Sequence, residues 1–359
     1  KMSMLTTKLK QFTSSLQRGT VTGSFNTAVQ TLEILREFIA AGKWASAEEL
    51  INVIKTDCKI VTDAKPLELA VGNMVRRILH IIREEYYEYS DEEAREQEDA
   101  PNAEQKFSAV KRASSMIDIL ERDSKRQSFS NTYTNLKTRI LEGVNAEKAD
   151  LDDVYVQIAD QALEHIHSNE VILTFGKSRT VTEFLKAAGR KRKFEVLVAE
   201  SVPSYYGHEL ALELSESNIQ TTLVTDSAVF ALMARVNKVI VGTHAVMANG
   251  GLIAHPGTHM LAQAAKHHSI PFVVCTGLYK LSPEFPQSYT KLGTFSELNN
   301  PNEIMDFTEG EAVAEVRVCN PAWDYVPPEL VSLYLTNSGG HSPTYIYRLL
   351  AEVYSPEDL

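Results

Sequence analysis

The chain has few cysteines, and no regular pattern relates them. Cys58, Cys275 and Cys319 are odd in number, lie far apart and include no Cys-x-x-Cys pair. This spacing argues against a disulfide framework and indicates no zinc site. It fits a protein kept in a reducing environment.

Long hydrophobic runs and a surplus of positive charge are also missing. The longest apolar runs, such as Val239-Ile240-Val241, have the length of a strand, and no charged-then-apolar signal pattern opens the chain. The formal net charge is −11, which disfavours nucleic acid as the main partner because phosphate binding needs a concentrated basic surface. We therefore expect a soluble cytoplasmic protein that binds neither membranes nor nucleic acid directly.

What the chain does contain is enough apolar material for two domains. It has 359 residues, of which 43% are hydrophobic. Over residues 1–165 the apolar positions recur at helical spacing, as in Leu32, Leu35 and Ile39. An acidic stretch near 84–105 has almost no aliphatic residues, and we predict a mobile, solvated loop there. The first part is therefore predicted to be a helical domain with one acidic loop.

From residue 166 the pattern changes to short β-branched runs that alternate with helical segments. The predicted strands are 171–174, 194–199, 221–225, 238–242 and 271–276. Such alternation is typical of a parallel sheet that is covered on both faces by helices. We predict a Rossmann-like α/β domain over 166–359, so the fold class of the chain is α/β.

One loop has part of a nucleotide-binding motif. Gly176-Lys177-Ser178 follows a predicted strand and resembles the end of a P-loop. That motif needs a glycine five positions before Gly176, and the residue there is Val171. We interpret the segment as a strand-to-helix turn, and no nucleotide cofactor is predicted.

Other polar groups have ordinary structural explanations. The histidine pairs at 165/167 and 267/268 have no carboxylate or cysteine at ligand spacing, so no metal site is predicted. Asp226 follows a strand and is interpreted as a helix cap, with a catalytic base as the alternative. The basic run Arg190–Lys193 is interpreted as a solvated turn, with an acidic partner surface as the alternative.

A series of short segments resembles one superfamily. The segments are 236–244 (VNKVIVGTH), 248–251 (ANGG), 257–258 (GT), 264–267 (AAKH) and 271–272 (PF), with Arg18-Gly19 and residues 320–330 extending the likeness over nearly the whole chain. The superfamily unites sugar-phosphate isomerases, notably methylthioribose-1-phosphate isomerase, with the regulatory subunits of the guanine-nucleotide exchange factor of eukaryotic translation initiation. The resemblance implies that a sugar-phosphate site once lay at the ends of the strands.

Three positions depart from the isomerase pattern. Where those enzymes have a cysteine after the first strand, this chain has Gly176, and His244 stands in place of the catalytic aspartate. Val202 replaces the arginine that precedes a proline and holds the sugar phosphate. These changes remove the thiol, the carboxylate and the guanidinium that the reaction needs, so we expect a vestigial site without catalysis.

The end of the chain is similar to one branch of the family, the beta-type regulatory subunits. The segments concerned are 336–350, 165–171 and 280–283. The resemblance implies pairing with a delta subunit through the α/β domain, and a larger assembly with alpha, gamma and epsilon subunits. It also implies a client, the initiation factor that delivers initiator transfer RNA, which is bound through its alpha subunit and inhibits exchange when phosphorylated. The helical domain is expected to face this client.

Candidates for the delta interface lie on or beside the first three predicted strands. They are Asn169, Val171, Leu197 and Thr222, which we expect at the edge of the sheet. Two alternative functions stay open beside the regulatory one. The first is a residual sugar-phosphate isomerase, and the second is a sensor whose vestigial cavity binds a sugar phosphate or a nucleotide without turnover.

Overall fold

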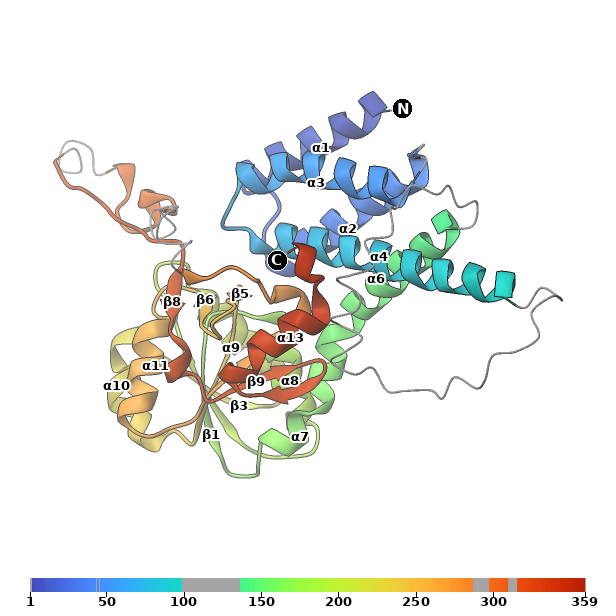
Figure 1. Ribbon diagram of the computed structural model, residues 1–359. Coiled ribbons are helices and arrows are strands. Elements are labelled where there is room, and N and C mark those ends of the chain that lie inside the picture. The colour runs from blue at the N-terminus through green and yellow to red at the C-terminus, as the bar shows by residue number, and fades with distance from the viewer. Residues whose placement is uncertain are drawn as a thin grey trace.

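The computed structural model describes residues 2–42, 44, 46–98, 136–286, 297–308 and 315–358. A bundle of helices precedes an α/β domain, as predicted (Figure 1). Among the described residues, no helix is both long and apolar enough to cross a membrane.

The bundle is built on amphipathic helices that bury one face each. Its helices are α1 (Met2–Gln17), α2 (Ser24–Ala41), α3 (Ala47–Ala64), α4 (Leu69–Glu98) and α6 (Leu136–Asp160), followed by the short α7 (Ala162–His165). Leu32, Ile78 and Ile140, from three of these helices, are fully buried in one core. The Ser46 side chain accepts a hydrogen bond from the Glu49 backbone and so caps α3.

The prediction of an acidic loop is wrong for residues 84–98, which continue α4. Tyr86 is 2% exposed and packs into the core of the bundle, so this part of the segment has an apolar anchor despite its charge. Glutamate and arginine are also good helix formers. Residues 99–105 lie outside the described residues.

The α/β domain contains a seven-stranded sheet in the order β10-β9-β7-β4-β1-β2-β3. Its strands are β1 (Val171–Phe175), β2 (Glu195–Ala199), β3 (Gln220–Val224), β4 (Lys238–Gly242), β7 (Phe272–Cys275), β9 (Leu333–Thr336) and β10 (Gly339–His341). All neighbouring pairs are parallel except β9 and β10. The five predicted parallel strands are therefore confirmed.

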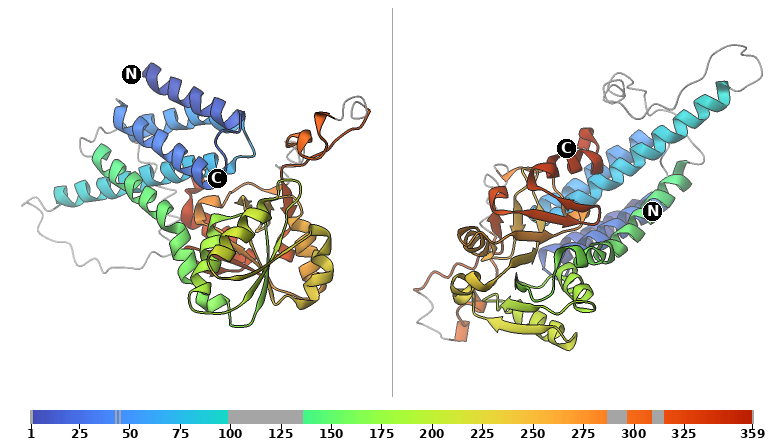
Figure 2. Two further views of the ribbon diagram at one scale, coloured as in Figure 1. Left: turned by 180° about the vertical axis from the view of Figure 1, so that it is seen from behind. Right: turned by 90° about the horizontal axis from the view of Figure 1, so that it is seen from below.

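Helices cover both faces of this sheet (Figures 1 and 2). They are α8 (Arg179–Gly189), α9 (Tyr206–Glu216), α10 (Val229–Leu232), α11 (Thr258–His267) and α13 (Ile346–Val353), joined by the 3-10 helices η1 (Asp226–Ala228), η2 (Met233–Arg235), η3 (Leu278–Lys280), η5 (Pro301–Glu303), η7 (Pro328–Leu330), η8 (Pro343–Tyr345) and η9 (Pro356–Asp358). Alternate residues of β1 point to opposite faces: Ile172 packs with α8 and α9, whereas Leu173 packs with α10, α11 and α13. Residues at the end of α6, such as Ile158, join the core between β1, α8 and α9.

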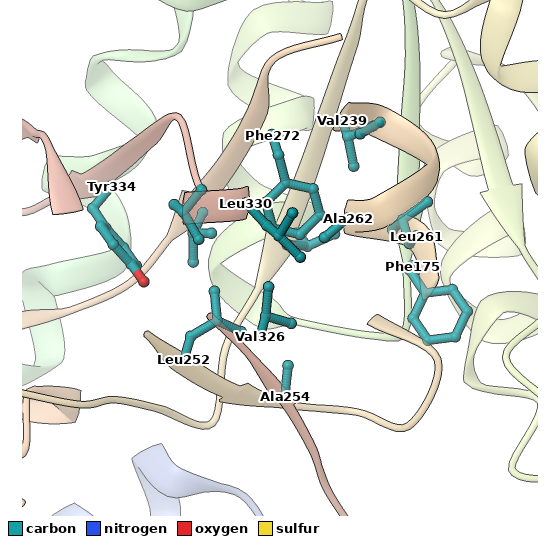
Figure 3. Packing of buried hydrophobic residues seen from close by; sticks show 14 of the residues in the cluster. Phe175, Val239, Leu252, Ala254, Leu261, Ala262, Phe272, Val326, Leu330 and Tyr334 are labelled. Atoms are coloured by element: carbon teal, nitrogen blue, oxygen red, sulfur yellow. The ribbon is translucent and has the colours of Figure 1, made fainter. Parts of the chain in front are cut away.

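A second, three-stranded sheet was not predicted. It consists of β5 (Ala245–Val246), β6 (Leu252–Ala254) and β8 (Asp324–Val326) in antiparallel pairing. Leu252 and Val326 face Phe272 and Tyr334 of the main sheet (Figure 3). The Tyr334 hydroxyl donates to the Gly250 carbonyl at 2.7 Å. The small sheet therefore closes one end of the main core.

The strand order corrects the expected place of the delta-interface candidates. Strands β1 and β2, which hold Val171 and Leu197, lie inside the sheet, and Leu197 is 6% exposed. Of the first three strands only β3 lies at an edge, and its Thr222 is exposed, as is Asn169 in the turn before β1. The edge placement is therefore wrong for Val171 and Leu197, because crossover connections put consecutive strands next to one another inside the sheet. The interface itself stays a prediction.

A glycine near the start of α9 offers a test of this packing. A Cβ at Gly207 would lie 1.9 Å from the Ala199 carbonyl oxygen, so Gly207→Ala must displace backbone at the end of β2. We expect this variant to lose about 1–3 kcal/mol of unfolding free energy, measured by thermal denaturation. Gly340→Ala is the matched control, since its Cβ would make ordinary contact at 3.5 Å with Leu333. Equal stability of the two variants would contradict the close approach of α9 to β2.

Candidate functional site

A cavity of about 460 Å³ lies where the carboxyl ends of β1 and β4 meet the helical bundle. The turns 175–180 and 242–244 line it from the α/β domain, and residues 23–26 at the start of α2 line it from the bundle. Open α/β sheets bind ligands at this edge. The cavity is thus formed by both domains.

Gly176 lies on the wall of this cavity, where the chain leaves β1. Its φ of +70° falls in the left-handed region, which favours glycine. Its backbone N–H donates to Ser201 Oγ at 2.9 Å and so ties the turn after β1 to the turn after β2. The position expected for a catalytic cysteine therefore contributes backbone only, and a side chain there would be strained.

Val202 lies in the exposed turn after β2 and is not among the described residues that line the cavity. The backbone N–H groups of Ser201 and Val202 donate to the two Asp226 carboxylate oxygens at 2.9 and 2.8 Å. Asp226 thus braces this turn, and its interpretation as a helix cap is wrong. Thr225 occupies the N-cap position of η1 instead.

Two cations line the cavity: Lys177, which was interpreted as part of a strand-to-helix turn, and Arg179, which sequence reasoning missed. The Lys177 ammonium lies 2.9 Å from Glu209 and is neutralised by it. The Arg179 guanidinium lies 4.0 Å from the ring centre of Tyr155 and 5.0 Å from that of Phe25. Within the described ranges no carboxylate is in ion-pair distance of Arg179, so this cation is held by aromatic faces. Its place just after Gly176-Lys177-Ser178 was the available sequence signal.

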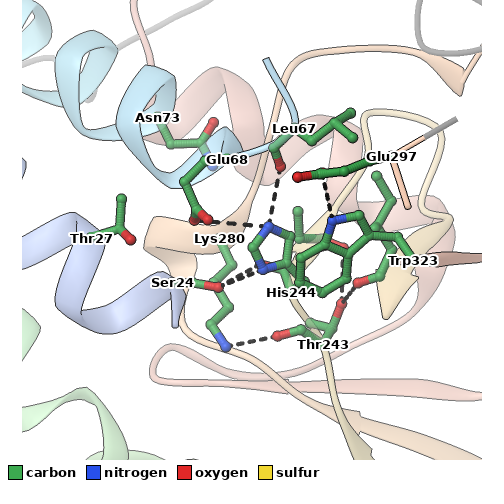
Figure 4. A network of polar contacts seen from close by, with 12 residues as sticks. Ser24, Thr27, Leu67, Glu68, Asn73, Thr243, His244, Lys280, Glu297 and Trp323 are labelled. Atoms are coloured by element: carbon green, nitrogen blue, oxygen red, sulfur yellow. Dashed lines mark hydrogen bonds and ion pairs between the residues drawn. The ribbon is translucent and has the colours of Figure 1, made fainter. Parts of the chain in front are cut away.

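His244 does not point freely into the cavity but joins the two domains (Figure 4). Its Nδ1 lies 3.0 Å from the Ser24 hydroxyl of α2, and its Nε2 lies 3.2 Å from the Leu67 carbonyl oxygen just before α4. The imidazole stacks on Trp323 with ring centres 3.9 Å apart. Burial lowers the pKa of His244, and the nearby Glu68 carboxylate opposes that shift.

Lys280, from η3, is buried on the other side of the same cluster. Its Nζ donates to the Thr243 carbonyl oxygen at 2.7 Å. Burial lowers the pKa of Lys280 to about 8, against the attraction of the Glu68 carboxylate. The side chains of Glu68 and Lys280 are thus both buried in one cluster around His244.

The described residues around the cavity do not form a nucleophile and base pair. Cys275 lies on β7 outside the lining, and burial raises the pKa of its thiol to about 12. His255 lines the cavity, but its Nδ1 contacts the Pro256 carbonyl oxygen and its ring packs on Tyr206. Nor do the described His, Cys, Asp and Glu residues form a group of three or more that could hold a metal ion. This arrangement can bind a polar ligand, and its described residues pair no nucleophile with a base.

The fold and the cavity thus define an α/β protein with a cavity at the carboxyl edge of its parallel sheet, where the described residues pair no nucleophile with a base. A family model described as the initiation factor 2 subunit family matches residues 20–343. The chain belongs to this family.

Individual relatives place it more finely. The beta subunit of translation initiation factor eIF2B from Dictyostelium discoideum is 45% identical, over 98% of this chain and 96% of the relative. A chain of the tetrameric eIF2B-beta2-delta2 complex from C. thermophilum superposes with a TM-score of 0.72 at 27% identity, over 98% of this chain and 95% of that one. The 5-methylthioribose 1-phosphate isomerase of Pyrococcus horikoshii OT3 shares the fold, with a TM-score of 0.57 at 19% identity over 96% and 87% of the two chains. Within the family, the chain is a beta-type, non-catalytic member.

The cavity generates a prediction about catalysis. We expect the purified chain not to turn over methylthioribose-1-phosphate in an assay that measures product formation. Gly176→Cys combined with His244→Asp should not restore turnover, because Val202 supplies no cation and a catalytic group must be held to within about 0.5 Å. Turnover by the unmodified chain would overturn this conclusion. Calorimetric titration of the same preparation with sugar phosphates and nucleotides separates ligand binding from turnover.

Proposed function

We propose that the chain is a regulatory and scaffold subunit of the cytoplasmic guanine-nucleotide exchange factor that recharges the initiator-tRNA-delivering initiation factor with GTP. The observation that carries the proposal is the similarity to eIF2B beta subunits along nearly the whole chain. A cavity with Gly176 and His244 at the isomerase positions supports it, since such a subunit needs no chemistry of its own.

In this proposal the α/β domain pairs with a delta subunit, and alpha, gamma and epsilon subunits complete the assembly. The beta2-delta2 tetramer formed by the C. thermophilum relative supports the first pairing. On this chain the edge strand β3 is the best surface for it: Thr222 and Leu223 are exposed there, and the backbone of an edge strand has unpaired groups.

The client is proposed to be the initiation factor itself, contacted through its alpha subunit. An exchange factor binds the nucleotide-free client more tightly than the nucleotide-bound one. A subunit without chemistry can contribute by positioning the client and by responding to its phosphorylation. The bundle is proposed as the client-facing part, and the exposed Glu48, Lys59 and Ile60 of α3 supply one suitable surface.

A ligand sensor is the second candidate function. The favouring observation is the cavity of about 460 Å³ with the Arg179 guanidinium at its wall, where no carboxylate of the described residues pairs with it. A sugar phosphate or a nucleotide has the negative charge that this group would attract. Saturable binding without turnover in the titration would support the sensor, whereas residual isomerase activity is opposed by Gly176, Val202 and His244.

The pairing with delta gives a first test. Obligate interfaces bury about 2,000 Å² or more and resemble a divided core, so the isolated chain should self-associate and its melting temperature should rise when delta is added. Leu223→Lys should weaken co-purification with delta. Val156→Lys on α6 is the control, because both native side chains are 43% exposed. A soluble monomer whose melting temperature does not change when delta is added would contradict the pairing.

The coupling to exchange gives a second test. Glu48→Lys and Lys59→Glu reverse charges on the exposed face of α3 and should change client affinity or the response to client phosphorylation. Gly176→Leu should instead perturb folding or pairing, because a leucine at φ +70° costs about 1–3 kcal/mol. Nucleotide release from the client, phosphorylated or not, is measured with rebuilt complexes. Normal exchange from both α3 variants, with lost exchange from an assembled Gly176→Leu complex, would reverse the assignment.

A further inference from the structure

The helical bundle and the α/β domain meet through polar groups at the edge of the cavity. Three segments far apart in the sequence converge there: the start of α2 at Ser24, the turn Leu67-Glu68 before α4, and the loop after β4 that holds Thr243 and His244 (Figure 4). A small apolar cluster adjoins this point, with Leu69 of α4 packed on residues of β5 and β6. The contact therefore links the two domains and does not belong to either core.

His244 makes two more contacts with the bundle. Besides its ring contacts with Ser24 and Leu67, its backbone carbonyl oxygen accepts from the Ser24 hydroxyl at 3.1 Å. Its Nε2 also lies 3.8 Å from a Glu68 carboxylate oxygen. One residue thus holds the first residue of α2 and the segment that leads into α4.

The charges beside His244 are buried and depend on one another. Glu68 is 5% exposed and Lys280 is 9% exposed. Glu68 Oε1 has no hydrogen-bond partner among the described residues; it lies 3.8 Å from His244 Nε2, and Lys280 is the nearby buried cation that its charge attracts. A buried charge that loses its partner is strongly destabilising, whereas removing both charges together costs much less.

We propose that Glu68, His244 and Lys280 form an interdomain latch, a buried charge cluster that fixes the starts of α2 and α4 on the α/β domain. The position that holds the catalytic aspartate in the isomerases fastens the helical domain in this chain. The latch is independent of the proposed function, because it concerns how the two domains of this chain are joined.

A second interdomain contact limits what the latch controls. Arg83 of α4 donates to both carboxylate oxygens of Asp358 near the end of the chain, at 3.2 and 3.1 Å. It holds α4 independently of the latch. Loss of the latch should therefore open the cavity side of the interface and leave the domains attached.

The test compares hydrogen exchange of the full chain, co-expressed with a delta subunit, in Glu68→Gln, Lys280→Met and the double variant. Each single variant should raise exchange about tenfold or more over residues 24–30 and 67–74, with β1 and β4 unchanged. The double variant should recover most of the protection, because no unpaired charge is left. Arg348→Met with Glu352→Gln removes an exposed ion pair and should change neither segment.

Two further variants keep the test decisive if a single charge variant does not fold. Ser24→Ala removes only the hydroxyl contact with His244 and should raise exchange at the start of α2. His244→Asp places a second carboxylate beside Glu68 and should raise exchange more than His244→Asn does. Additive effects of Glu68→Gln and Lys280→Met would overturn the latch. So would a rise spread evenly over both domains, or unchanged exchange in Ser24→Ala together with equal effects of the two His244 variants.

Discussion

Burial of the parallel sheet on both faces is the constraint on which the rest of the structure depends. Strands β1 and β4 have helices above and below, so most of their side chains are committed to two apolar cores. The polar groups of the cavity come from the turns where these strands end and from the bundle. The cavity, Arg179 and His244 all lie at that edge, and the bundle packs over the same edge. A change of residue there affects both the site and the contact between the domains.

Much of the α/β domain could be predicted from the sequence because its strands are short β-branched runs between helical segments. The ends of β1, β2, β3, β4 and β7 agree with the prediction to within a residue. Their order in the sheet was harder, because it depends on crossover connections and not on local sequence, and this is why Val171 and Leu197 were placed at an edge. The small sheet could not be predicted, because β5, β6 and β8 have two or three residues each, too few to show a recognisable alternation of apolar and polar residues.

The candidate site was predicted in part, because the strands that lead to it were predicted. Gly176 and His244 follow strands of a parallel sheet, so both had to reach its carboxyl edge, and both line the cavity. The partners of His244 could not be predicted, because Ser24 and Leu67 come from helices whose docking depends on tertiary packing. Composition misled in the acidic segment, where Tyr86 is buried in the core of the bundle and α4 continues to Glu98.

The proposed latch and the expected absence of catalysis meet at position 244. An aspartate at 244 would lie beside the buried Glu68, and two carboxylates so close cannot both stay ionised away from water. A neutral imidazole in that place can donate from Nε2 to the carbonyl before α4 and accept at Nδ1 from the hydroxyl of α2. In the proposed function the site needs no catalysis, so the loop after β4 is available to hold the bundle. An enzyme fold could in this way become a rigid part of a larger assembly without a change of architecture.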